Sequence, residues 1–186
     1  STMPSFAMRT QSSKADYYRL EVHLRLPTSF CSPSFAYLMA GDSKDVLEPL
    51  AGFDEKGNIF PRLAAEIPSR ENGGISEDMT SITWKIKPDL KWSDGTDFTA
   101  EDVKFTAEYC MHPEGGCAQL ARYEGVKSVE AVDPLTVKFT TAKPSPILPT
   151  LLAQMAISSP NTPMGVYTNE PVGTGPYRFV SWTQGQ

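Results

Sequence analysis

Residues 81–87 constrain the fold more than any other stretch of the chain. Ile82, Trp84 and Ile86 alternate with polar residues, so an extended backbone places these three apolar side chains on one face. A large aromatic ring in this position needs a hydrophobic core to cover it. The pattern predicts a half-buried β-strand, and Pro88 ends it because proline donates no hydrogen bond to a sheet.

A turn and a helix are predicted directly after this strand. The Asp-Gly pair at 94–95 favours a tight turn, because glycine accepts the positive φ that such turns require. Thr99 with Asp102 three residues later forms the pattern of a capping box, which predicts a helix over residues 99–111. The His-Pro pair at 112–113 ends the helix. We expect Trp92, beside the turn, to cover an edge of the core.

The second half of the chain predicts a β-hairpin and a shorter helix. The hairpin pairs residues 126–132 with residues 135–140 around an Asp-Pro turn. The shorter helix has Ser145 as its cap and Pro146 at its first position, and extends to about Gln154. Together these elements indicate the α+β class, a mostly antiparallel sheet with short helices packed on it.

The two ends of the chain are less regular. Apolar residues alternate over 20–26 and predict a strand, whereas residues 1–16 are polar and aperiodic and are predicted to be a flexible tail. Residues 158–176 are rich in Pro, Gly, Ser and Thr and predict a crossing loop. The glycines of its Gly173-Thr174-Gly175 run are expected to let the chain cross here. Residues 177–182 then predict a final strand.

Charge and hydropathy exclude several functions. The net charge of the 186 residues is −5, which disfavours a nucleic-acid partner, because such a partner would require a basic patch. No apolar run approaches the ~20 residues that span a bilayer. The first residues do not resemble a signal peptide, and the charged residues before Cys31 do not resemble a lipoprotein anchor.

The cysteines leave several alternatives open. Cys110, His112 and Cys117 offer three soft ligands in eight residues, but a zinc site normally needs four, so we predict no metal site. A disulfide between Cys110 and Cys117 is favoured, since the intervening Pro-Glu-Gly-Gly can turn the chain back. That bond would leave Cys31 as an odd thiol, and three reduced cysteines remain the alternative.

No catalytic group is predicted. Cys110 and His112 are two residues apart near a helix end, so their side chains point in different directions. The nearby carboxylates are explained by turn and capping chemistry, or by solvation, without acid–base catalysis. We therefore predict a protein that is not an enzyme and that uses no cofactor.

Four motifs then resemble family 5 of the extracellular solute-binding proteins, the dipeptide, oligopeptide and nickel-binding group. They are P-R-L-A-A-E-I-P, K-W-S-D-G-T-D-F-T-A-E-D-V, V-K-S-V-E-A-V-D-P-L-T-V-K-F and G-T-G-P-Y, and they occur in the family's order. The resemblance covers residues 47–182, and residues 1–45 match it poorly. The chain is identified as similar to an N-terminal fragment of such a protein.

The resemblance implies a periplasmic-binding-protein type II-like architecture, in which two lobes close on a ligand. It divides the chain into an N-terminal segment (1–45), a small inserted α+β domain (46–161), and a crossing loop with a strand of the first lobe (162–186). It places Met39, Ala40 and Gly41 on the ligand side. The implied partners are a peptide or other small solute and the membrane permease of an ABC transporter, in the periplasm or outside the cell.

Two other functions remain open at the level of sequence. The chain can be a truncated accessory or vestigial fragment that folds without binding ligand, because the opposing lobe is absent from these residues. A thiol- or metal-dependent enzyme using Cys110, His112 and Cys117 is the third reading.

Overall fold

The computed structural model describes residues 5–10, 19–23, 48–113, 120–157, 159–160, 172–174 and 177–182. The elements in these ranges are the strands β1 (Ser5–Thr10), β2 (Arg19–His23), β3 (Ala51–Phe53), β4 (Ile59–Pro61), β5 (Ser81–Lys85), β6 (Val126–Asp133), β7 (Thr136–Thr141) and β8 (Tyr177–Trp182), the helices α2 (Ala100–Met111) and α3 (Leu148–Ala153), and the 3-10 turn η1 (Leu120–Tyr123). All pairings between these strands are antiparallel.

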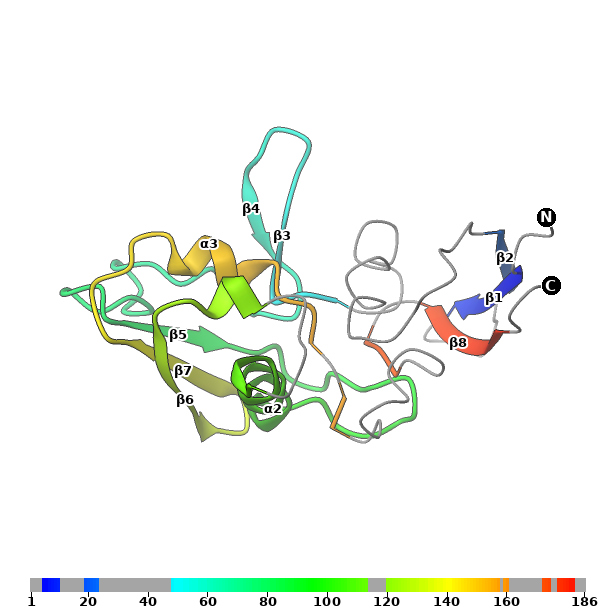
Figure 1. Cartoon of the computed structure of the whole chain (residues 1–186). Coiled ribbons are helices and arrows are strands. Elements are labelled where there is room, and N and C mark those ends of the chain that lie inside the picture. Colours follow the sequence, from blue (N-terminus) through cyan, green and yellow to red (C-terminus); the bar gives the residue numbers. More distant parts are fainter. Residues whose placement is uncertain are drawn as a thin grey trace.

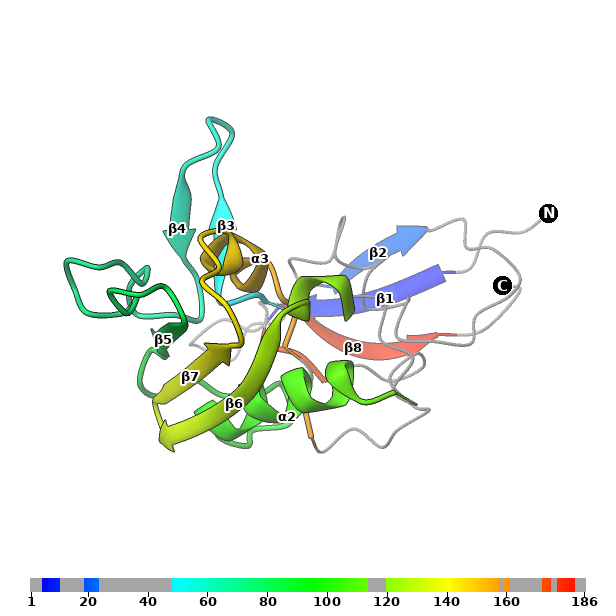
Figure 2. The ribbon, with the colours of Figure 1, turned by 60° about the vertical axis from the view of Figure 1, so that its left-hand side comes forward.

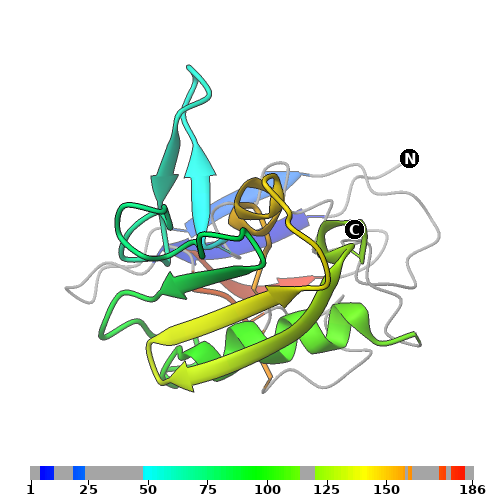
Figure 3. The same ribbon diagram turned by 90° about the vertical axis from the view of Figure 1, so that its left-hand side faces the viewer.

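A three-stranded sheet with the order β5-β7-β6 forms the body of the fold. Helix α2 packs along β6 and β7, as Figure 3 shows. The first helical amide, that of Ala100, donates to the carbonyl of Pro134 in the β6–β7 turn at 2.8 Å. Helix and hairpin are therefore joined at the helix N-terminus. The strand, helix and hairpin that the sequence predicts in this region are all confirmed.

The core lies between this sheet, α2 and α3. Ile82, Trp84 and Ile86 are all buried, so the predicted phase of the strand is confirmed. The other large side chains that are fully buried include Trp92, Phe139, Leu50, Leu63, Leu152, Met155, Ile157 and Val103. Among the described side chains, the indole nitrogen of Trp84 is the one buried polar atom without a hydrogen-bond partner.

A separate hairpin, β3–β4, projects from this body (Figure 2). Its turn is organised by Asp54, whose carboxylate accepts hydrogen bonds from the amides of Lys56 and Asn58, both at 2.8 Å. Gly57 takes a φ of +81° there, a conformation that side chains with a Cβ rarely adopt. Asp54 and Gly57 together close the turn between β3 and β4.

The prediction of a flexible tail over residues 1–16 was wrong for β1. This strand pairs with β2 on one side and with β8 on the other, in the sheet order β2-β1-β8 (Figure 1). The strand has no period-two pattern of its own, and one of its two partners, β8, comes from the other end of the sequence. The strands predicted near residues 20–26 and 177–182 are present as β2 and β8.

Two smaller predictions also need correction. Helix α3 begins at Leu148 with Ile147 as its N-cap, and Ser145 and Pro146 precede it. Pro149 lies in its first turn, where a missing amide hydrogen leaves no helical bond unmade. Trp92 does not cover an edge of the core; its side chain is buried inside it.

Candidate functional site

Three passages of the chain meet at one end of the α+β body. The residues from Glu48 to Pro49 lie beside Ala156 and Ile157, since Pro49 forms a bridge with Ala156 and the Ile157 amide points to the Glu48 carbonyl at 3.5 Å. The third passage is residues 172–174, where Gly173 is hydrogen-bonded to Ser93 and Thr174 to Glu48. We call the residues Glu48, Arg62, Ser93, Gly173 and Thr174 the crossing junction.

Ser93 connects the loop after β5 to the third passage. Its amide donates to the carbonyl of Gly173 at 2.8 Å, and the Gly173 amide points back to the Ser93 hydroxyl at 3.4 Å. Both residues are buried. The Val172 side chain packs against the core. Residues 172–174 are therefore attached to the body by main-chain hydrogen bonding and by apolar contact.

Glu48 supplies the negative charge of the crossing junction, and Arg62 supplies the positive charge. Its carboxylate lies 3.7 Å from the Arg62 guanidinium, at the base of the β3–β4 hairpin, and each side chain retains 24% of its exposure. Burial raises the pKa of the Glu48 carboxyl. Arg62, Lys87 and a hydrogen bond with the Thr174 side chain oppose this rise without cancelling it. The charged form of Glu48 is thus net penalised in the folded chain.

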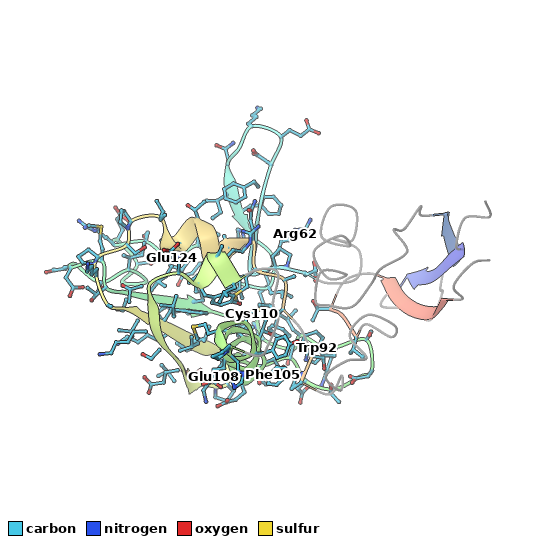
Figure 4. The ribbon with its side chains drawn as sticks, viewed as in Figure 1. Arg62, Trp92, Phe105, Glu108, Cys110 and Glu124 are labelled. Atoms are coloured by element: carbon cyan, nitrogen blue, oxygen red, sulfur yellow. The ribbon has the colours of Figure 1, made fainter. Side chains whose placement is uncertain are left out.

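A buried hydrogen bond holds the loop that carries Ser93. The indole nitrogen of Trp92 donates to Asp102 Oδ2 at 2.9 Å, and the Thr99 amide donates to the same oxygen at 2.9 Å. One carboxylate therefore caps α2 and fixes the loop beside it. Figure 4 shows Trp92 next to this helix and Arg62 at the base of the hairpin. Burial raises the pKa of Asp102 in spite of these two donors.

The residues predicted to face a ligand lie outside the described part of the chain. This holds for Met39, Ala40 and Gly41, and also for Cys117. Cys110 is buried on the face of α2 that meets the core, whereas His112 is exposed at the end of the helix. The pairing of Cys110 with Cys117 stays a prediction.

No group of three or more His, Cys, Asp or Glu side chains suited to a metal ion occurs among the described residues. Within the same residues, no helix combines the length and the apolar character that a bilayer crossing needs.

The comparisons with known proteins decide the family. The sequence profile of the bacterial extracellular solute-binding proteins, family 5 Middle, matches residues 58–186. This chain belongs to family 5 of the bacterial extracellular solute-binding proteins. The described part is accordingly a portion of the type II periplasmic-binding-protein fold, the architecture that the resemblance implied.

Individual relatives agree with this assignment. The glutathione-binding protein GsiB of Pectobacterium atrosepticum is 33% identical over 147 residues, which is 76% of this chain and 27% of the relative. NikZ of Campylobacter jejuni, solved with Ni(L-His), is 31% identical with a TM-score of 0.67, over 76% of this chain and 28% of that one.

A third relative is AppA of Bacillus subtilis, an oligopeptide-binding protein solved with a nonapeptide. It is 28% identical with a TM-score of 0.66, over 78% of this chain and 30% of its own. The chain therefore spans between a quarter and a third of the length of these solute-binding proteins. The relatives are binding proteins of small solutes, which agrees with the expectation of a protein that is not an enzyme.

The crossing junction was only partly visible in the sequence. The Gly-Thr-Gly run and the Trp-Ser-Asp-Gly run were both recognised as motifs, but nothing in their spacing indicated that Ser93 contacts Gly173. Glu48 carried no signal beyond its charge.

The pH dependence of stability tests the electrostatics at Glu48. A carboxyl whose folded pKa lies above its unfolded pKa stabilises the fold below the unfolded value, and this contribution is lost as pH rises through the folded value. We therefore expect Glu48→Gln to gain stability relative to the wild type as pH rises from 4 to 7. Thermal melting of both proteins at several pH values measures this difference.

Asp78 provides the matched control, because its pKa is shifted in the other direction. Hydrogen bonds from Ser76 and Thr80 lower the pKa of Asp78 to about 2. Asp78→Asn should therefore lose stability relative to the wild type as pH rises through the unfolded value of aspartate. If Glu48→Gln followed the same direction as Asp78→Asn, attraction to Arg62 would outweigh burial at Glu48, contrary to this account.

Proposed function

We propose that this chain is part of the substrate-binding subunit of an ABC-type importer, which captures a peptide or a similar small solute outside the cytoplasm. The observation that carries the proposal is the family match over residues 58–186. The relatives support the solute class, since those named above bind glutathione, a nickel–histidine complex and a nonapeptide. The partner that receives the solute would be the membrane permease of the importer.

The proposed binding mode is capture between two lobes, with this chain contributing one side. The ligand-side residues proposed for it are Met39, Ala40 and Gly41, which the family resemblance supports. The division into an N-terminal segment, a small inserted domain over 46–161 and a first-lobe segment over 162–186 belongs to the same proposal. A site that covers one side of a solute leaves the other side in water, so the contacts it offers are few.

A titration followed by NMR tests whether and where a solute binds. The ¹⁵N-labelled chain is titrated with reduced glutathione and, separately, with trialanine, each up to about 10 mM, a concentration suited to millimolar affinity. We expect fast-exchange shifts that include the amides of Met39, Ala40 and Gly41. The amides of the β6–β7 hairpin serve as the internal control and should not move. An absence of shifts with both solutes would favour the fragment that folds without binding.

We also propose that Cys110 and Cys117 form a disulfide, as the four residues Pro-Glu-Gly-Gly between helix and cysteine permit. Protein produced in an oxidising compartment should then show one reactive thiol, that of Cys31, when it is denatured without reductant. Cys31→Ala should show none. Three reactive thiols in the wild type would contradict the pairing.

A further inference from the structure

The pair Gly173–Thr174 is contacted from two sides by residues that lie far away in the sequence. On one side the Ser93 amide donates to the Gly173 carbonyl at 2.8 Å, a short bond for an amide donor. On the other side the Thr174 side chain is hydrogen-bonded to the Glu48 carboxylate. The two contacts act on neighbouring residues of one short segment.

Both contacts originate from groups that the body itself holds in place. Ser93 follows Trp92, whose ring is buried and whose indole nitrogen is bonded to Asp102. Glu48 is paired with Arg62, and its carbonyl faces the Ile157 amide. The contacts on Gly173–Thr174 are thus made by side chains and amides with little freedom of their own.

We infer that Glu48 and Ser93 are positioning residues that hold residues 172–174 in one place against the α+β body. We call these two contacts the clamp and residues 172–174 the joint. The sequence alone predicted a crossing loop here and did not indicate these contacts. Neither Gly173 nor Thr174 is among the residues with positive φ, so the glycine at 173 is not required by a left-handed backbone.

The inference predicts that the two contacts protect the amides of this segment from hydrogen exchange together. If the Thr174 hydroxyl helps to hold the segment, its removal should also weaken the neighbouring bond from the Ser93 amide. The Ser93 amide is therefore the reporter, because the substitution at Thr174 does not touch it directly. No solute takes part, so a failure of this test leaves the proposed function unaffected, and the reverse also holds.

Amide hydrogen exchange, resolved by NMR on the full 186-residue chain, provides the measurement. In Thr174→Val, we expect the Ser93 and Gly173 amides to exchange at least ~10-fold faster, while the β7 amides of Val137 and Phe139 keep their rates. Thr174→Ser retains the hydroxyl and should stay within ~3-fold of the wild type. Thr140→Val, in β7, is the matched control and should leave Ser93 unchanged.

Two results would overturn the inference. An unchanged rate at Ser93 in Thr174→Val would mean that the two contacts are not coupled and that the segment is not clamped. Equal acceleration at Ser93 and in β7 would mean that the substitution lowers global stability without opening a local joint. Acceleration confined to Ser93 and Gly173, with recovery in Thr174→Ser, is the result that the clamp requires.

Discussion

Replacing Trp84 by alanine should lower the free energy of unfolding by about 3–5 kcal/mol, the range for deleting a large buried aromatic side chain. Its ring is completely buried between Ile82 and Ile86 on the inner face of β5. Removal leaves a cavity in the core, which cannot collapse without moving main chain. Urea unfolding of both proteins, followed by circular dichroism, measures the change.

Two further variants show whether burial causes this loss. Phe60→Ala removes a large aromatic ring that is 37% exposed on the projecting hairpin, and should have a clearly smaller effect. Trp84→Phe keeps a ring while removing the indole nitrogen that has no partner, so it should be milder than Trp84→Ala. A loss below about 1 kcal/mol for Trp84→Ala would be that of a surface site, which contradicts the packing described here.

Replacing Asp102 by alanine should have the next largest effect, about 2–4 kcal/mol from two separate causes. Loss of an N-terminal cap costs about 1 kcal/mol. The Trp92 indole nitrogen would also be left buried without its acceptor, which costs about 1–3 kcal/mol. Denaturant unfolding of the wild type and of Asp102→Ala measures the combined loss in the free energy of unfolding.

Asparagine at the same position separates hydrogen bonding from charge. The amide oxygen of Asp102→Asn can accept from Thr99 and Trp92, and the substitution removes a charge that burial penalises. We expect its loss to be smaller than about 1 kcal/mol, because the asparagine oxygen keeps both hydrogen bonds that Asp102 accepts. If the asparagine variant were as unstable as the alanine variant, ionic interactions of the carboxylate would have to account for the stability.

Local patterns were sufficient for the elements that carry their own signals. The alternation around Trp84, the capping box at Thr99 and the Asp-Pro turn at 133–134 each predicted an element that the structure contains. In each case the stabilising contacts lie within a few residues or on one face of the element. Such contacts leave a visible period or spacing in the sequence.

Contacts between distant residues were not predictable in the same way. Strand β1 pairs with β8 at the other end of the chain, and its sequence has no alternation that would indicate this. The burial of Trp92 depends on Asp102, ten residues further on, and on the covering of both by the core. The crossing junction combines residues as far apart as Glu48 and Thr174, and its contact between Ser93 and Gly173 spans 80 positions. The pattern of a single sequence carries no information on contacts between residues so far apart.

The affinity of the 186-residue chain for small solutes tests the central claim, that it supplies one side of a two-sided capture site. A complete pocket buries ~70–90% of the surface of a small ligand, and one side can bury only about half of that. Since each tenfold in affinity corresponds to ~1.4 kcal/mol, we expect dissociation constants no tighter than millimolar. Isothermal titration calorimetry with reduced glutathione and a pooled library of di- to pentapeptides makes the measurement. A micromolar dissociation constant would contradict the account, because these residues would then hold a self-sufficient site.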